Sequence, residues 1–587
     1  MSPRCQAIAV RCSAGPRAVA YPSLGIVRIH GRAYVVVMSL GTSDYRPRDA
    51  EHAVLYRVID EHLDAFLETV SRHADGGSLP DFVEREFRDF LTCGVLAHGF
   101  ARLRCTDCEL ERLVPFSCKG RGFCPSCGWR RMTECAARLV DEVLPRVPVR
   151  QWVLSLPYRL RYLLAWDHGL ARAVLAVYVR ALLGVQRDRA RRYGIRDGRS
   201  GSVTVIQRFG GGLNLNVHFH TLVFDGVFFG DGGTGAFDFH PLPPPTDEEV
   251  GVVLARIAAR VRRLLRRRGL DPGDADVFRA DPVIEESPAL AGISSASIQG
   301  RIALGPRAGA RVWRVGGDPD APWVLSTAPR HAHLDGFDLH ANVEAPAADR
   351  ARLEQLCRYL LRPAVAQDRL RLLEDGRIAL TLKTAWADGT RQLVFEPLEL
   401  LEKLAALTPR PRSNLVIYHG VLAPHSSWRA RAVTYGAPPA AMAGAASTTP
   451  ETNNGPAMTP APRHWAWADL MRHAFDIDVL ACPRCGGRLR LMATVEDPDA
   501  VRAILAALAE SRGMAGRAPP FAAGHTISQT GRSAPERYRN AAVAEVCSLA
   551  SWGRCLPSTS APFRQKVPRQ AGCPRCAGGK RPGGQEC

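Results

Sequence analysis

Lysine is nearly absent from this sequence. Lysine and arginine together number 77 of the 587 residues, yet only five of them are lysine, and the formal net charge is +19. A GC-rich genome would explain why arginine replaces lysine, but it would not explain the excess of positive charge. Guanidinium groups bind phosphate oxygens through paired hydrogen bonds, so an arginine-rich surface suits nucleic acid. The composition therefore favours a nucleic-acid-binding protein.

Long apolar runs are also missing. No run of 18 or more apolar residues occurs, so we expect no membrane span. The N-terminal residues include basic side chains but no apolar segment followed by a cleavage site, which argues against export. We therefore expect a cytoplasmic protein. With 46% hydrophobic and 23% charged residues, most of the chain should fold, and its length suits two to four domains.

Cysteine, by contrast, is abundant. The 17 cysteines include several Cys-x-x-Cys pairs, which argue for metal binding rather than disulfides in the cytoplasm. The pairs Cys105/Cys108 and Cys124/Cys127 are fifteen residues apart and together supply the four thiolates of a structural Zn²⁺ site. Four further candidates lie nearby: Cys93, His98, Cys118 and Cys135. They could hold a second ion, or Cys118 could replace one of the four ligands of the first.

Two further features concern these cysteines. Basic residues surround the pairs, and we predict that Arg121, Arg130 and Arg131 contact DNA. Farther along the chain, Cys482 and Cys485 form only half a site. Their partners could be a later Cys-Pro-Arg-Cys pair at 573–576 or another chain, and the balance favours no metal there.

Residues 214–224 predict a β-strand that carries two histidines. His218 and His220 point to the same face because strand side chains alternate, and a divalent metal is the commonest shared reason for such a pair. The glycines at 210–212 predict a hairpin that places Gln207 opposite His218. Gln207 is then either a third, oxygen ligand or an exposed strand residue. Two nitrogens and one oxygen would suit Mg²⁺ or Mn²⁺ acting on a phosphate.

The order of elements predicts an α+β fold. A strand at 149–157, a long helix at about 167–192, the histidine hairpin and a helix after residue 246 follow one another. This order resembles an antiparallel sheet of the split β-α-β, ferredoxin-like type with packed helices, preceded by a helical and zinc-ribbon module. We also expect a helix over 348–373 in spite of Pro363.

Three phrases of the sequence resemble one known family. They are 206–220, with Gln207, His218 and His220; 357–363, with Tyr359; and 418–424. Histidine-hydrophobe-histidine on a strand, followed by a tyrosine on a later helix, resembles the HUH nucleases. The set resembles one branch, the rolling-circle transposases of bacterial insertion sequences, which carry an N-terminal zinc-binding domain. The resemblance covers about residues 50–430.

The resemblance implies a specific chemistry. Tyr359 would attack a phosphate of single-stranded DNA and form a 5′-phosphotyrosine, with structural zinc upstream and a catalytic Mg²⁺ or Mn²⁺ at the histidines. Arg358 and Arg362 would bind DNA and compensate charge, because an unperturbed phenol has a pKa of about 10. The family often has a second tyrosine one helical turn away, where this chain has Gln355. The chain therefore looks like the single-tyrosine, common-region (ISCR-type) relatives.

Other functions remain open at this point. A plasmid rolling-circle replication initiator or relaxase would use the same chemistry without end-specific excision or insertion. A zinc-binding, DNA-binding regulator would show no metal-dependent nicking. An inactive transposase copy would bind DNA without reacting.

The sequence divides into six segments. We predict, in order, an uncertain N-terminal extension at 1–49, a helical and zinc-binding domain at 50–146, a catalytic domain at 147–431 with an insertion at 270–335, a disordered linker at 432–463, a small Cys-x-x-Cys module at 464–515 and a disordered tail at 516–587.

Overall fold

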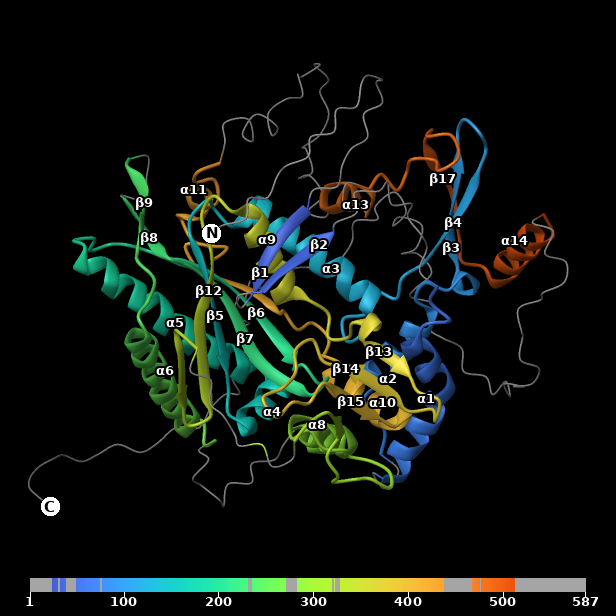
Figure 1. Cartoon of the computed structure of the whole chain (residues 1–587), viewed down its shortest axis with the longest axis horizontal. Coiled ribbons are helices and arrows are strands. Elements are labelled where there is room, and N and C mark those ends of the chain that lie inside the picture. Colours follow the sequence, from blue (N-terminus) through green and yellow to red (C-terminus); the bar gives the residue numbers. More distant parts are fainter. Residues whose placement is uncertain are drawn as a thin grey trace, which may run out of the picture. The chain divides into compact units, whose positions relative to one another are not determined.

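The structure is a computed structural model, shown in Figure 1. It describes residues 49–73, 77–230, 235–270, 282–318, 321, 328–437, 467–475 and 477–511, together with the strands β1 (Leu24–Ile29) and β2 (Arg32–Val37). Most of the expected extension, linker and tail lies outside these residues.

A six-stranded sheet forms the centre of the fold. Every neighbouring pair of strands is antiparallel. In spatial order the strands are β11 (His331–Leu334), β12 (Phe337–Ala345), β5 (Val149–Ser155), β7 (Leu215–Phe224), β6 (Gly201–Phe209) and β16 (Val416–Gly420). The expected α+β class with antiparallel sheets is confirmed.

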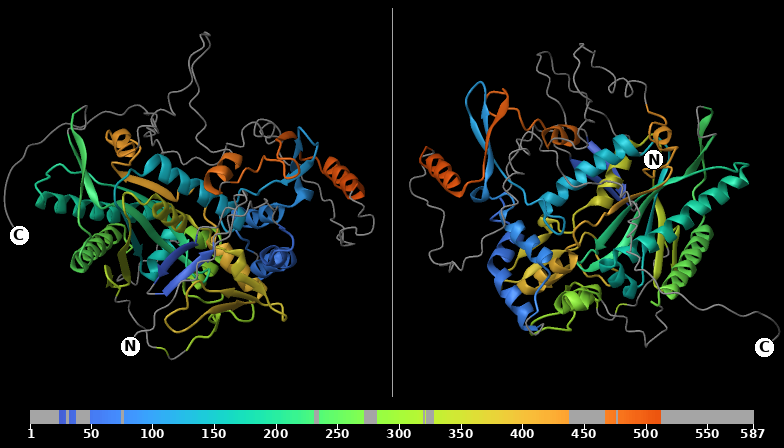
Figure 2. Two further views of the ribbon diagram at one scale, coloured as in Figure 1. Left: turned by 45° about the horizontal axis from the view of Figure 1, so that its top comes forward. Right: turned by 180° about the vertical axis from the view of Figure 1, so that it is seen from behind.

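Helices cover one face of this sheet. These are α4 (Tyr158–Trp166), α5 (His168–Arg192) and α6 (Asp247–Arg267). Trp152, Leu154 and Phe219 point toward them and form part of the main apolar core. Helix α6 begins with the capping box that Thr246 predicts, and it lies alongside α5 in the rear view of Figure 2.

Helix α5 also resembles a membrane span by composition. Among the described residues it is the one helix long and apolar enough to cross a membrane, but half of its most apolar stretch is buried within the structure. Because α6 packs along it, α5 has the surroundings of a core helix.

The opposite face of the sheet packs against α9 (Arg350–Leu361). Val205 and Leu222 from the sheet and Leu356 and Leu360 from α9 share a second apolar core. The helix predicted over 348–373 is too long, because α9 ends before Pro363, whose ring excludes the helical conformation at the preceding residue. After this helix come η3 (Gln367–Arg369) and β13 (Leu370–Leu372).

The N-terminal helices pack beside a second sheet. Helices α1 (Val54–His73) and α2 (Asp81–Thr92) contact each other, and α1 also contacts α10 (Pro397–Leu407). The second sheet has the order β10 (Trp313–Val315), β15 (Gln392–Phe395), β14 (Ile378–Thr381) and β13. The expected insertion at 270–335 is partly regular, with α7 (Pro282–Glu286) and α8 (Pro288–Ile298), and α8 packs on α10.

A third sheet joins distant parts of the chain. Its order is β17 (Leu489–Val495), β3 (Phe100–Cys105) and β4 (Glu111–Pro115), as Figure 1 shows. The expected C-terminal module therefore adds a strand to the zinc-binding region.

The remaining elements are short or peripheral. They are η1 (Leu96–His98), α3 (Pro125–Arg138), η2 (Leu139–Val143), β8 (Gly226–Gly230), β9 (Phe237–Pro241), α11 (Arg429–Val433), α13 (Trp467–Phe475) and α14 (Pro498–Ser511).

Candidate functional site

The two histidines of β7 face each other. Their Nε2 atoms are 3.0 Å apart. Nδ1 of His218 donates to the carbonyl of Asn216 at 2.8 Å, and the side-chain amide of Gln151 lies 2.7 Å from Nδ1 of His220. Each imidazole is therefore fixed through Nδ1, and both Nε2 atoms converge on one point.

Both imidazoles are buried, and burial favours their neutral form. Burial lowers the pKa of His218 to about 4, with smaller contributions from Arg362 and Arg161, although the hydrogen bond to Asn216 opposes the shift. Burial also holds the pKa of His220 well below its usual range, and the neighbouring His218 adds to the effect. Neutral imidazole is the form that binds a metal ion.

Gln207 lies where the hairpin predicts. The strand register pairs it with His218, and its side chain is buried, so the alternative of an exposed strand residue is wrong. Its amide nitrogen donates to the carbonyl of Leu360 on α9 at 2.7 Å. Its Oε1 is buried and has no hydrogen-bond partner. This acceptor oxygen therefore lies on the same face of the sheet as the two imidazoles, whose Nε2 atoms form a hydrogen bond with each other.

Tyr359 lies next to the histidine pair. Its ring stands edge-on to the ring of His220, with centroids 5.8 Å apart, and the residue is 39% exposed. Helix α9 therefore presents the phenol to solvent at the border of the histidine pair.

Cationic side chains surround the tyrosine ring. The Arg362 guanidinium lies 4.3 Å from the ring centroid and the Lys383 ammonium 5.5 Å from it. The other predicted arginine, Arg358, forms an ion pair with Glu354 at 2.6 Å on the same helix. Lys383 was not predicted, because it comes from the loop after β14, and no local motif points to it. Gln151, on β5, was missed for the same reason.

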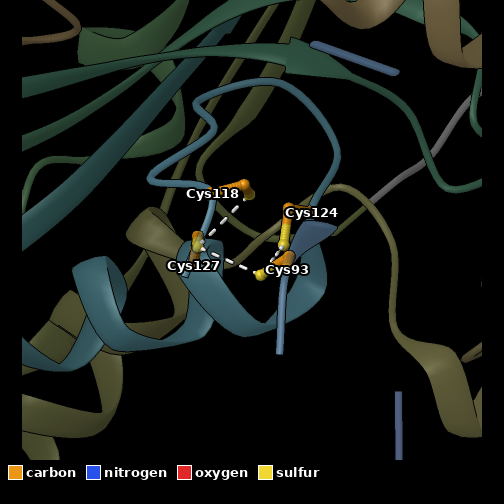
Figure 3. A group of neighbouring side chains, drawn as sticks. All are labelled: Cys93, Cys118, Cys124 and Cys127. Carbon is orange, nitrogen blue, oxygen red and sulfur yellow. Dashed lines mark hydrogen bonds between the residues drawn. The ribbon is translucent and has the colours of Figure 1, made fainter. Parts of the chain in front are cut away.

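Within the part of the chain that the structure describes, the cysteines form two groups instead of one. In the first, shown in Figure 3, the sulfur atoms of Cys93, Cys118, Cys124 and Cys127 all lie within 4.8 Å of one another. Neighbouring sulfurs are 3.6–3.8 Å apart. Four sulfurs bound to one zinc ion at about 2.3 Å would lie about 3.8 Å apart, so the group fits zinc.

The second group contains Cys105 and Cys108 together with the C-terminal pair Cys482 and Cys485. Cys105 and Cys108 meet Cys482 and Cys485, with sulfur pairs 3.5 Å apart. The predicted grouping of Cys105 and Cys108 with Cys124 and Cys127 is therefore wrong.

The physical reason for the two groups is the path of the chain. Strands β3 and β4 carry the first pair to the tip of a hairpin, and the second pair returns to the end of α2, beside Cys93. The candidates Cys93 and Cys118 join the first group, whereas His98 is exposed and lies in neither.

Contacts among the four thiols of the first group shift their pKa values in opposite directions. The neighbouring thiols, Cys118 first and then Cys124 and Cys93, hold the pKa of Cys127 far below its usual range. Cys124 caps the N-terminus of α3, and Cys127 lies in its first turn. The pKa values of Cys118 and Cys124 are raised, so these contacts favour the thiolate at Cys127 and the thiol at the other two.

The predicted DNA-contacting arginines of this region differ in their surroundings. Arg121 is exposed. Arg131 donates to the carbonyls of Lys119 and Gly120, which holds the loop that carries Cys118. Arg130 is half-buried, and burial lowers the pKa of its guanidinium.

A third group of potential ligands lies on the hairpin of β11 and β12. His331 and His333 both approach the same carboxylate oxygen of Asp338, at 2.9 and 2.8 Å. Without a metal, both imidazoles contact Asp338, whereas Nδ1 of His331 is buried without a hydrogen-bond partner.

Comparison with known proteins defines the class. Residues 201–430, which include the histidine pair, Gln207 and Tyr359, match a family model described as "Putative transposase". This match supports a transposase, a class of nucleic-acid-processing enzyme that binds DNA. Residues 58–156 match the model of a transposase zinc-binding domain of the IS91 type. Together the two matches support an IS91-type transposase with an N-terminal zinc-binding domain. No curated protein and no solved structure matches the chain significantly.

Proposed function

We propose that this transposase nicks single-stranded DNA through Tyr359 and transfers the strand in rolling-circle transposition, as a single-tyrosine enzyme with an HUH-type fold. The observation that carries the proposal is the convergence of four groups on one face of the sheet. These groups are the Nε2 atoms of His218 and His220, the unpartnered oxygen of Gln207 and the half-exposed phenol. We place the reaction in the bacterial cytoplasm, on the DNA of the nucleoid.

The two Nε2 atoms and the Gln207 oxygen fit an octahedral divalent ion. Two ligand atoms at neighbouring positions of such an ion, each about 2.1 Å away, lie about 3.0 Å apart. The two Nε2 atoms have this separation. Three protein ligands would leave positions for DNA and water, and the bound Mg²⁺ or Mn²⁺ would polarise the scissile phosphate. Imidazole nitrogen favours Mn²⁺ over Mg²⁺.

The chain's own residues would carry the remaining steps. The Tyr359 oxygen forms a bond to phosphorus, the bond from phosphorus to the 3′ oxygen breaks, and the phenol proton passes to solvent. The leaving 3′ oxygen takes up a proton. Because one phosphodiester-type bond replaces another, strand transfer needs no ATP. Arg362 and Lys383, next to the ring, would stabilise the phenolate and the charge that develops on the phosphate.

A single nucleophile restricts the reaction order. Gln355, one turn before Tyr359 on α9, is exposed and cannot form a phosphotyrosine. The first covalent link must then be resolved by the free 3′-OH or by water before the same tyrosine acts again.

The test is a suicide oligonucleotide that carries the element end, incubated with Mn²⁺ or Mg²⁺. Mass spectrometry should detect a covalent adduct on the peptide that contains Tyr359. Tyr359→Phe should abolish the adduct and keep DNA binding, because only the hydroxyl is lost. Tyr193→Phe is the matched control, since Tyr193 is also exposed, but its ring lies tilted against that of His240 and not against the histidine pair.

Two outcomes would contradict the proposal. An adduct that persists in Tyr359→Phe would mean that another residue is the nucleophile. Complete absence of metal-dependent nicking by the unmodified chain would favour a DNA-binding regulator.

A further inference from the structure

The second cysteine group brings together residues that are far apart in the chain. Cys108 and Cys482 are separated by 374 positions, and their sulfur atoms lie 3.5 Å apart. The region that matches the transposase model lies between them. The zinc-domain match ends at residue 156, so it contains only two of these four cysteines.

The backbone around each pair forms a tight turn. Near Cys482, the N–H of Gly486 donates to the carbonyl of Cys482 at 2.8 Å, and Gly486 has a φ of 75° that a glycine adopts readily. Near Cys105, the N–H of Asp107 points to the Cys105 sulfur at 3.5 Å. Such turns aim two thiols and backbone N–H groups at one point, as zinc knuckles do.

A shared sheet holds the two turns together. Strand β17 pairs with β3 in an antiparallel register that runs from Leu489 opposite Cys105 to Val495 opposite Phe100. Across the turns, the N–H of Thr106 donates to the carbonyl of Arg488 at 3.1 Å. The two cysteine pairs are therefore joined by backbone hydrogen bonds as well as by proximity.

The apolar core of this sheet is too small to hold its strands together without further support. Its buried core consists of four residues: Leu103, Cys105, Cys482 and Leu489. A core of this size is too small to hold a separate module together, and small modules of this kind depend on a metal.

We propose that Cys105, Cys108, Cys482 and Cys485 bind one zinc ion that completes a zinc ribbon split across the chain. The N-terminal half supplies β3, β4 and one turn. The C-terminal half, residues 477–495, supplies β17 and the other turn. The transposase domain is thus inserted between two halves of one zinc module. The described residues then carry two zinc sites, of which the second needs the C-terminal segment.

Zinc content gives the first test. The full-length protein should hold two zinc ions per chain by elemental analysis. Cys482→Ser combined with Cys485→Ser should lower the content to one, because two thiolates do not form a stable tetrahedral site. Cys135→Ser is the control, since Cys135 belongs to neither group, and it should retain two. Two ions in the double variant would overturn the proposal.

The second test measures whether zinc holds the C-terminal segment on the N-terminal half of the module. A specific protease site is inserted within residues 438–466 of the full-length protein, and the chain is cut there. Without denaturant, the C-terminal fragment should remain bound to the N-terminal fragment, and a zinc chelator should release it.

Two double variants distinguish the second cysteine group from the first in this test. Cys482→Ser/Cys485→Ser should release the fragment without chelator, whereas Cys93→Ser/Cys118→Ser, which disrupts the first group, should retain it. A fragment that leaves the zinc-loaded protein, or one that stays after complete removal of zinc, would show that zinc does not join the two halves.

Discussion

At the residue scale, the position of the proton on the His220 ring depends on the side-chain amide of Gln151. When the Gln151 nitrogen donates to Nδ1, the proton of the neutral imidazole resides on Nε2 and points at His218. When the amide turns, its oxygen accepts from Nδ1, and Nε2 becomes free to bind a metal ion. Partners of this kind fix the tautomer of metal-binding histidines in proteins.

Replacement of Gln151 should therefore weaken the proposed metal site. We expect Gln151→Leu to lower Mn²⁺ affinity by about 10- to 100-fold, because Nδ1 loses its acceptor. Gln151→Glu should restore most of the affinity, since a carboxylate can accept from Nδ1. Isothermal titration with Mn²⁺ measures both variants. Unchanged binding by the leucine variant, or equal losses in both, would exclude this role for Gln151.

At the scale of elements, the first zinc group abuts the helix that carries the tyrosine. Gly128 lies in the first turn of α3, directly after Cys127, and a Cβ atom there would approach the Cβ of Pro363 to 2.7 Å. Pro363 follows the last turn of α9, two residues beyond Leu361. The zinc-bound end of α3 therefore sets the position of the end of α9, and with it that of Arg362 and Tyr359.

A single methyl group should disturb this contact. Gly128→Ala should slow adduct formation, because the proline ring cannot rotate away and α9 must shift. Gly251→Ala in α6 is the matched control, since nothing lies within 4 Å of its Cβ, and it should be neutral or stabilising by up to about 1 kcal/mol. Single-turnover adduct rates and urea unfolding test both variants. Equal rates would show that α3 does not position α9.

The features that sequence predicts are those that local patterns determine. The alternation along β7, the glycine turn that pairs Gln207 with His218 and the capping box at Thr246 all follow from neighbouring residues. Helical periodicity continues past Pro363, but α9 ends at Leu361, because proline disfavours the helical conformation of the residue before it. The grouping of cysteines and the approach of Lys383 to Tyr359 depend on the path of the folded chain, which spacing alone does not fix.

At the scale of the whole molecule, the net charge of +19 makes the affinity for DNA depend on salt concentration. Neutralising phosphates releases condensed counterions, so affinity falls with salt in proportion to the number of contacts. For single strands, each contact contributes about 0.7 to the slope of log affinity against log salt. The slope therefore counts phosphate contacts without requiring a structure of the complex.

Substitution of Arg121 tests one such phosphate contact. It is exposed on the loop that leads from Cys118 to α3, where sequence predicts DNA contact. Arg121→Ala should weaken binding of single-stranded DNA irrespective of sequence and reduce the salt slope by about 0.7, with the adduct rate at saturating DNA unchanged. Arg57→Ala on α1, which removes an exposed arginine beside Glu61, should leave the slope unaltered. Fluorescence anisotropy over a range of salt concentrations measures both slopes. An unchanged slope in the Arg121 variant would remove this loop from the DNA-binding surface, whereas an equal decrease in both variants would mean that the slope reports overall charge and not a contact.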